Sequence, residues 1–233
     1  GTMRTYLDCL PCFLRQALST ARRFTDSEQI RERVIRDVLH LLAEVELGTP
    51  APRVAQRVYP TIYAALGHPD PYLEVKRECT ERALALLPGL ERRVAASRDP
   101  FRAAVKLALA GNIIDFGIVA PFDLDATIER VLDEEPRFDE IERLERIAAR
   151  AGQILFLADN AGELVLDRPL LGQLLERAEV TVAVRGGPTI NDVTREDVGP
   201  SGLDPRLRVI APEAVLPGIW LEGSGAAFRR AFD

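Results

Sequence analysis

The stretch ILFLADNAGELVLD, residues 154–167, decides the fold of this 233-residue chain. Its first five residues are apolar, and they run directly into Asp159, Asn160 and, three positions later, Glu163. A short apolar run bounded by polar turn residues is typical of a buried strand. Because a helix is expected to follow Gly162, the stretch predicts a strand, a polar turn and then a helix.

The residues after Gly152 repeat this pattern. Apolar and β-branched runs such as VTVAV and LRVIA alternate with helical segments, which implies parallel strands joined by helices, as in a doubly wound sheet. The residues before Gly152 indicate amphipathic helices, with start signals at the capping box TDSE, residues 25–28, and at Asp99-Pro100. We therefore expect an α/β protein with a helical domain over residues 3–150 and an α/β domain over residues 151–233.

The composition is that of an ordinary soluble globular protein, with 47% hydrophobic and 28% charged residues. A net charge of -6 argues against a nucleic-acid surface, and the apolar runs are too short to cross a bilayer. No secretory segment opens the chain, and three cysteines suit a reducing compartment. We expect a cytoplasmic protein whose partners are neither nucleic acids nor membranes, and the sequence predicts no oligomeric state.

Cys9 and Cys12 form a CxxC near the start of the chain. One isolated pair fits structural thiols and a metal or redox role equally well, so both alternatives stay open. Cys79 lies on an apolar helical face and is expected to be a core thiol. The two histidines, His40 and His68, follow no ligand pattern, which argues against histidine-based catalysis.

Polar residues follow two consecutive strands. Asp159 and Asn160 follow the first strand, and the segment VRGGPTINDVT places Arg185 and Asp192 after the second. Open parallel sheets bind ligands outside the carboxyl ends of their strands, so these side chains could converge on one point. Asp and Asn also cap helices and fill turns, but two such clusters at consecutive strand ends favour a site. Oxygen ligands from Asp159, Asn160 and Asp192 suit a hard divalent ion such as magnesium or manganese.

The same edge offers groups that can bind an anion. Gly186 and Gly187 allow backbone N–H groups to approach a ligand closely, and the helix after Asn160 points its positive end there. Arg185 can fork onto phosphate oxygens. A metal ion, a helix N-terminus, two glycines and an arginine together indicate a phosphorylated ligand.

Four segments resemble the damage-control phosphatase family, first catalogued as domain of unknown function 89. In chain order they are DCLPCFLRQAL, AGNIIDFG, LADNAGELVLDRPLL and VRGGPTINDVTREDV. The likeness runs from about Tyr6 to Asp233 and is greatest to the microbial branch that carries the CxxC. It implies a helical domain packed on a Rossmann-like, three-layer α/β domain with a mostly parallel sheet. It also implies a metal-dependent phosphatase of sugar phosphates, nucleotides or damaged phosphometabolites.

The resemblance also implies roles for particular residues. It makes Asp159, Asn160 and Asp192 the ligands of a divalent metal ion, with manganese, magnesium, cobalt and nickel as candidates. It places Asn112 and Asp115, which match the Gly-Asn-x-x-Asp motif of the family, at the active site as substrate-binding residues. The residue pattern by itself also fits a helix C-cap at Asn112.

One departure from the family concerns the end of the chain. The family continues past a segment like FRRAFD into further strands and a Lys-Gly-x-x-Asn loop that contacts phosphate, whereas this sequence stops at Asp233. Lys76 and Lys106, the two lysines, lie in the helical half and do not replace that loop. We therefore expect the α/β domain to lack a C-terminal piece.

The favoured interpretation is a phosphomonoester hydrolase in which a metal-activated water attacks the phosphoryl group in line. Arg185 and the loop amides would stabilise the equatorial oxygens, and Glu163 would orient the water or a metal ligand. One alternative is an S-adenosylmethionine-dependent methyltransferase, although its Gly-x-Gly loop is missing. The other is a non-catalytic protein that binds a metal ion or a phosphorylated ligand. The sequence does not predict which phosphorylated substrate is used.

Overall fold

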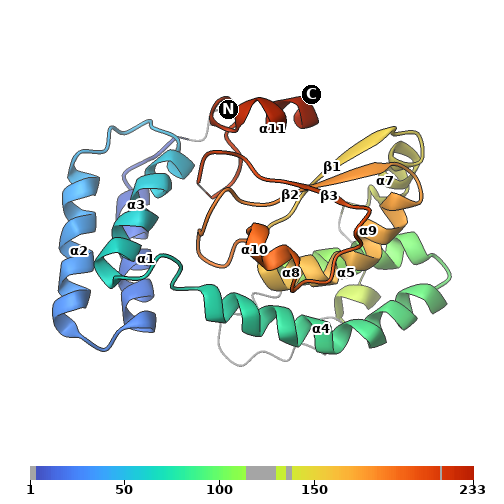
Figure 1. The fold of residues 1–233 in the computed structure, drawn as a ribbon, viewed down its shortest axis with the longest axis horizontal. Coiled ribbons are helices and arrows are strands. Elements are labelled where there is room, and N and C mark those ends of the chain that lie inside the picture. The colour runs from blue at the N-terminus through green and yellow to red at the C-terminus, as the bar shows by residue number, and fades with distance from the viewer. Residues whose placement is uncertain (1–3, 114–129, 135–137, 216) are drawn as a thin grey trace.

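The computed structural model describes residues 4–113, 130–134, 138–215 and 217–233, and Figure 1 shows their arrangement. The helices are α1 Cys9–Phe24, α2 Glu28–Ala43, α3 Ala51–Leu66, α4 Leu73–Ala96, α5 Pro100–Ile113, α7 Ile141–Ala148, α8 Ala161–Leu166, α9 Arg168–Leu175, α10 Arg195–Val198 and α11 Gly225–Phe232. The strands are β1 Gln153–Leu157, β2 Glu179–Ala183 and β3 Arg208–Ile210. None of the described helices combines the length and the apolar character that crossing a membrane requires.

The three strands form a parallel sheet in the order β1-β2-β3, as the sequence predicts. Ile154 of β1 pairs with Val180 of β2, and Thr181 of β2 pairs with Arg208 of β3. Because side chains alternate along a strand, Ile154 and Val180 point to one face of the sheet while Leu155 points to the other. Because β1 and β2 are parallel and paired along their whole length, their carboxyl ends meet at one edge of the sheet.

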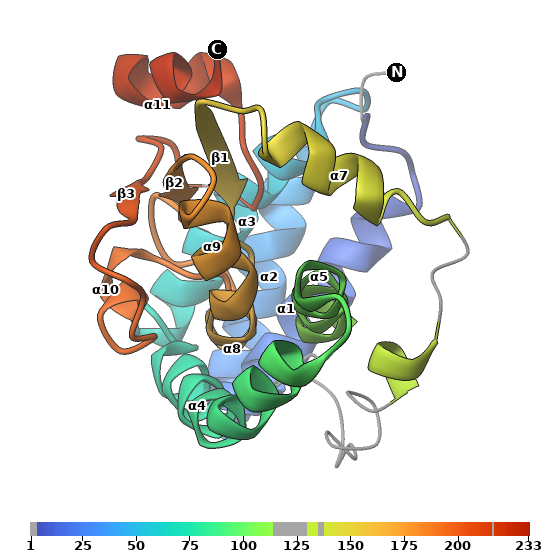
Figure 2. The ribbon, with the colours of Figure 1, turned by 90° about the vertical axis from the view of Figure 1, so that its right-hand side faces the viewer.

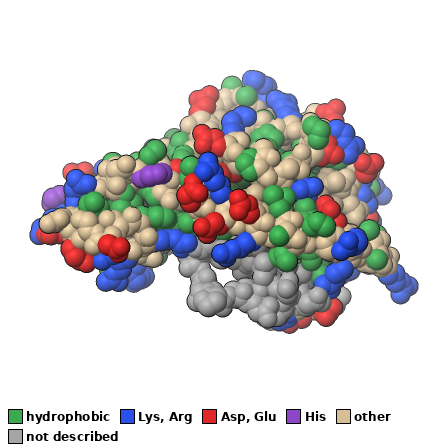
Figure 3. Space-filling view, turned by 60° about the horizontal axis from the view of Figure 1, so that its bottom comes forward, with side chains coloured by type: hydrophobic (Ala, Val, Ile, Leu, Met, Phe, Trp, Pro, Cys, Tyr) green, Lys and Arg blue, Asp and Glu red, His purple; other side chains and the backbone are tan. Residues whose placement is uncertain are grey.

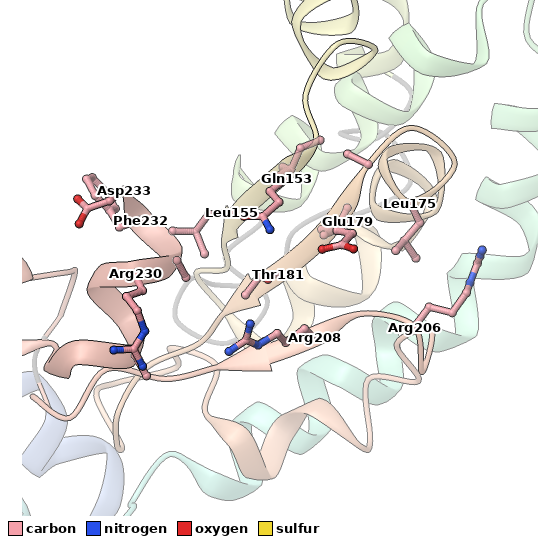
Figure 4. A pocket seen from close by; sticks show the side chains of 15 residues that line it. Gln153, Leu155, Leu175, Glu179, Thr181, Arg206, Arg208, Arg230, Phe232 and Asp233 are labelled. Atoms are coloured by element: carbon pink, nitrogen blue, oxygen red, sulfur yellow. The ribbon is translucent and has the colours of Figure 1, made fainter.

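Helices cover the two faces of the sheet unequally (Figure 2). Helices α4, α5, α7, α8 and α9 bury apolar residues against the first face. Helix α11 covers part of the second face, where Phe228 packs on Ala183 and Ile210. Beside α11 the second face has an open hollow of about 760 Å³, lined by side chains such as Gln153 and Thr181 (Figure 4). The expected three-layer α/β architecture is confirmed, with α11 in the third layer.

Helices α1, α2 and α3 form a bundle that stands to one side of the sheet in Figure 1 and has its own core. Val38, Val58 and Ile62 are fully buried in that core. Helix α4 belongs to the other core, where Ala83 and Leu87 pack with residues of α8 and the sheet. The helical half of the sequence is thus shared between two cores, and a domain boundary at residue 150 stays a prediction.

One helix start differs from its sequence signal. Helix α2 is capped by Ser27, whose Oγ accepts a hydrogen bond from Ile30 N, and not by Thr25. Thr25 is instead the C-cap of α1, where its backbone N–H donates to Ala21 O. The signal at Asp99 is confirmed, since its Oδ1 accepts a hydrogen bond from Arg102 N at 2.9 Å.

Candidate active site

The candidate site lies at the carboxyl ends of β1 and β2, where the segments that follow the two strands run side by side. Val193 N donates a hydrogen bond to Asp159 O at 2.7 Å. Asn160 and Asp192 face each other in an isolated antiparallel bridge. These backbone contacts bring the three expected ligands, Asp159, Asn160 and Asp192, to one place.

Arg185 lies between the two carboxylates. Its Nε donates to Asp192 Oδ2 at 2.7 Å, and its Nη2 donates to Asp159 Oδ1 at 2.8 Å. Its Nη1 donates to Ala158 O at 3.2 Å. The side chain of Arg185 is 9% exposed and that of Asp159 is 43% exposed, so the cluster opens to solvent on the side of Asp159. From the sequence, the guanidinium of Arg185 was expected to bind phosphate oxygens. In this structure it binds the two carboxylates instead.

Glu163, in the first turn of α8, fixes the side chain of Asn160. Asn160 Nδ2 donates to Glu163 Oε2 at 3.3 Å, which leaves Asn160 Oδ1 as the amide atom that can bind a cation. Burial raises the pKa of Glu163, the hydrogen bond from Asn112 opposes this effect, and the charge of Asp159 raises the pKa further. Glu163 therefore orients the side chain of Asn160, and its expected role toward a metal ligand or a water molecule stays a prediction.

Asn112 reaches the site from α5. Its Nδ2 lies 3.2 Å from both carboxylate oxygens of Glu163. Helix α5 continues past Asn112, so this residue is not a C-cap after Gly111. A Cβ on Gly111 would lie 3.3 Å from Glu163 Cγ, and the glycine therefore lets α5 approach α8 closely. Asp115, the other residue of the motif, lies outside the described residues.

The two glycines after Arg185 allow close packing of the loop. A Cβ on Gly186 would lie 2.4 Å from Pro212 O, and a Cβ on Gly187 would lie 2.9 Å from a methyl group of Val215. Across the described residues, the N–H groups of both glycines have no hydrogen-bond partner. The loop therefore keeps two donors for an anion, and phosphate binding by these glycines stays a prediction.

The site has an excess of negative charge. Besides Asp159 and Asp192, the carboxyl groups of Glu163 and Asp167 lie near enough to Asp159 for its charge to raise their pKa values. Burial raises the pKa of Asp192 to about 6, although the charge of Arg185 lowers it. Asp167 is 2% exposed, and burial, with the charges of Glu163 and Asp159, raises its pKa well above the usual value. The negative charges of Asp159 and Asp192 repel each other, and a cation near both carboxylates would relieve this repulsion.

The donor set shows whether this edge suits a metal ion. In the part of the chain that the structure describes, no three His, Cys, Asp or Glu side chains gather in a metal-binding arrangement. A metal ion here would need Asn160 Oδ1 as its third ligand, the atom that Glu163 leaves free. With Asp159 and Asp192 this gives an all-oxygen set, which fits a hard divalent cation.

The open hollow of Figure 4 is a different place from this site. It lies over Gln153 and Glu179, at the amino ends of β1 and β2, whereas ligands of parallel sheets bind at the carboxyl ends. On another face of the molecule, Figure 3 shows acidic side chains gathered near the middle with basic side chains beside them. The position of the hollow at the amino ends of the strands, and not its size, argues against it as the candidate site.

Two helical residues that support the site were not expected from the sequence. Tyr63 Oη of α3 accepts a hydrogen bond from Ile190 N at 2.9 Å. Lys76 of α4 is 1% exposed, and its Nζ donates to Asp197 Oδ2 at 2.9 Å. Asp197 Oδ2 in turn accepts a hydrogen bond from Thr194 N at 2.8 Å. A lysine on an otherwise apolar helical face was the one available signal, because a buried ammonium requires carboxylate partners.

Comparison with known proteins identifies the family. The family model for the damage-control phosphatase ARMT1-like domain matches residues 5–233. The chain belongs to this family. Membership in the damage-control phosphatase ARMT1-like family favours a phosphatase and decides against the methyltransferase alternative.

Archaeal members of the damage-control phosphatases are similar over most of this chain. The damage-control phosphatase PH1575 of Pyrococcus horikoshii is 32% identical over 235 residues, which cover 99% of this chain and 81% of that protein. A damage-control phosphatase of Archaeoglobus fulgidus is 33% identical over 195 residues, which cover 81% of this chain and 67% of that protein. The crystal structure of the Pyrococcus horikoshii DUF89 family protein PH1575 matches with a TM-score of 0.89 and 31% identity, over 99% of this chain and 81% of that one. The expected family and fold are confirmed.

Proposed function

We propose that the protein is a metal-dependent phosphatase that hydrolyses small phosphorylated metabolites. The observation that carries this proposal is the convergence of three oxygen ligands, Asp159, Asn160 and Asp192, at the carboxyl edge of a parallel sheet. Membership of the damage-control phosphatase family supports the reaction class. Phosphomonoesters are the proposed substrates, because one terminal phosphate can reach a metal ion and the neighbouring loop donors together.

The substrate class comprises sugar phosphates, nucleotides and damaged phosphometabolites. A mouse 4'-phosphopantetheine phosphatase is 31% identical over 149 residues, which cover 54% of this chain and 17% of that protein. Phosphopantetheine-like compounds therefore belong among the substrates to be tested. The metal ion is manganese in our proposal, with magnesium, cobalt and nickel as the other candidates.

The metal ion would be held by Asp159, Asn160 and Asp192. When bound, it would supply positive charge against the phosphoryl oxygens and lower the pKa of a water molecule. Glu163 keeps Oδ1 of Asn160 available by binding its Nδ2, and Asn112 holds Glu163 from the other side. This chain of amides and carboxylates orients the ligand set before substrate arrives.

Phosphoryl oxygens would be bound by the loop that follows β2. Arg185 has five N–H donors, and three of them are used on Asp192, Asp159 and Ala158. The remaining donors, with the free backbone N–H groups of the two glycines that follow, can stabilise the negative charge of the transition state. Arg185 would thus hold the ligand carboxylates and face the substrate at once.

We also place the chain in the microbial branch of the family and in the cytoplasm. The CxxC of Cys9 and Cys12 is the basis for the branch. Cys9, Cys12 and Cys79 form no disulfide bond, which suits a reducing compartment. Whether the CxxC pair has a metal or redox role stays open.

The test is a phosphatase screen over sugar phosphates, nucleotides and phosphopantetheine, with each of the four metals and with a chelator. We expect turnover with Mn²⁺, its loss with the chelator, and its loss in Asp192→Ala. Asp204→Ala is the matched control, because it makes the same substitution in a surface ion pair with Arg206 and should keep full activity. Binding of phosphorylated compounds without turnover under every metal would overturn the proposal in favour of a non-catalytic binding protein.

A further inference from the structure

The loop that carries Asp192 contains a backbone conformation that is unfavourable for its residue type. Ile190 has φ 49°, and within the described residues it is the one non-glycine residue with positive φ. A β-branched side chain is strained in this left-handed region because its Cβ crowds the backbone. Ile190 lies two residues before Asp192, so its conformation helps to set where the ligand carboxylate points.

The bundle of α1, α2 and α3 holds this residue in place. Tyr63 of α3 is buried, and its Oη accepts the hydrogen bond from Ile190 N at 2.9 Å across 127 residues of sequence. The side chain of Ile190 packs against the core of the bundle. On the other side of Ile190, Asp192 N donates to Thr189 O at 3.0 Å and closes the turn. The bundle therefore contacts both the backbone and the side chain of the strained residue.

We infer that Tyr63 is a positioning residue for the metal site: its hydroxyl keeps Ile190 in the left-handed conformation and so places Asp192 for metal binding. This inference rests on the proposed metal site, and it assigns the bundle of α1, α2 and α3 a role in positioning that site. The bundle supplies no ligand among the described residues, yet it controls the geometry of one. The competing explanation is that the Tyr63 hydrogen bond stabilises the fold without affecting metal binding.

The first experiment removes the hydroxyl alone. Tyr63→Phe keeps the aromatic ring, including its packing beside Tyr59 at 6.3 Å between ring centroids. We expect the Kd for Mn²⁺, measured by calorimetry, to rise about tenfold, the lower end of the range for residues that orient metal ligands. The matched control is Tyr72→Phe, which removes another buried hydroxyl of the same core, one shared with Thr20 Oγ1 at 3.1 Å. This control should lower stability and leave the Kd for Mn²⁺ unchanged.

The second experiment removes the strain. Glycine adopts positive φ without the steric strain of a Cβ, so in an Ile190→Gly background the tyrosine no longer has strain to oppose. In that background Tyr63→Phe should change the Kd for Mn²⁺ by less than about twofold, and the four proteins form a double-mutant cycle. All variants are first compared with the wild type by circular dichroism.

The outcomes separate this inference from the proposed function. A wild-type protein that binds no Mn²⁺ overturns the proposed metal site, and the inference falls with it. If the wild type binds Mn²⁺ and Tyr63→Phe binds it equally well, the positioning role alone is overturned. Equal weakening by Tyr63→Phe in the wild-type and Ile190→Gly backgrounds also overturns it, because the effect would then not act through the strained residue.

Discussion

Two clusters in this protein place one cation between two carboxylates, and their surroundings differ. The Arg185 cluster consists of Arg185 with Asp159 and Asp192. The side chain of Asp159 is 43% exposed, so this cluster is open to solvent on one side. Asp159, Asp192 and the carboxyl group of Glu163, which binds Asn160 beside them, bring three acidic groups to one guanidinium, and the cluster is therefore short of positive charge.

The Lys76 cluster lies behind the same loop and is closed. It consists of Lys76, 1% exposed, with Asp70 and Asp197 each 2.9 Å from its Nζ. Backbone N–H groups also donate to these carboxylates: Tyr72 N binds Asp70 Oδ1, and Thr194 N binds Asp197 Oδ2. Every charged group here already has its partners.

The Arg185 cluster and the Lys76 cluster have similar charges but differ in what they can do. A cluster that is open and short of positive charge can take up a cation, whereas a closed and satisfied cluster can only hold its elements together. The cations differ accordingly. The planar guanidinium of Arg185 spans two carboxylates and a carbonyl group, while the compact ammonium of Lys76 fits between two carboxylates as a point charge.

The largest expected effect comes from breaking the open cluster. Asp192→Ala removes a proposed metal ligand and leaves Arg185 without one of its two carboxylates. We expect Mn²⁺ affinity and turnover to fall by more than about 10³-fold, equivalent to about 4 kcal/mol. Calorimetric titration with Mn²⁺ measures the effect, and a Kd within tenfold of the wild-type value would contradict the assignment.

Breaking the closed cluster should affect stability. Lys76→Met leaves two buried carboxylates unpaired, which should lower the free energy of unfolding by about 3–4 kcal/mol. Urea denaturation at neutral pH measures this change. Arg57→Met is the control, because it breaks an exposed ion pair with Glu44 and should cost less than about 1 kcal/mol. Equal costs for the two variants would show that the Lys76 cluster does not contribute as argued.

Replacing Arg185 with lysine tests whether the Arg185 cluster needs a planar guanidinium or only a positive charge. In Arg185→Lys the positive charge remains, but one ammonium cannot reach both carboxylates and Ala158 O. We expect a loss of about 2–3 kcal/mol in transition-state stabilisation, which is roughly 30- to 150-fold in kcat/KM. Steady-state kinetics measure this loss, and wild-type kcat/KM in the variant would mean that charge alone is sufficient.

The smallest expected effect concerns the acidic surroundings of the open cluster. The folded-state pKa of Asp167 is raised by burial, so its contribution to stability is present below the unfolded pKa and is lost as pH rises through the folded pKa. Asp167→Asn cannot ionise, so it should be more stable than the wild type at pH 8, by about 1 kcal/mol, and equal to it near pH 3. Thermal unfolding of the chelator-treated proteins across this pH range measures the difference. A difference that does not change with pH would show that Asp167 does not titrate as expected.

Sequence patterns located the open cluster and not the closed one. Asp159 and Asp192 could be placed together because each follows a strand of a parallel sheet, and that rule holds whatever the sequence separation. Tyr63 and Lys76 lie 127 and 121 residues from the residues that they bind, on helical faces that periodicity assigns to a core. Periodicity reports that a helix face is buried but not which loop covers it.

The fold was predictable to a similar degree. The change of pattern at Gly152 correctly marks the start of the parallel sheet, because short apolar runs between helical segments have few other solutions. The start of α2 was misplaced because Thr25 fits two roles, the end of one helix and the cap of the next. The division of the helices between two cores was not predictable, since an amphipathic helix does not specify what it packs against.

The place of α4 between the two cores matters for exchanging parts among related proteins. At 1.5 Å per residue its 24 residues span about 36 Å, and Tyr72 just before it is buried in the bundle while its later residues pack on the sheet side. A chimaera joined at residue 150 would transplant α4 and α5 without the sheet core that they complete. A junction between α3 and α4 would instead move the bundle as a unit, provided that the donor's residue at position 63 matches the recipient's residue at position 190.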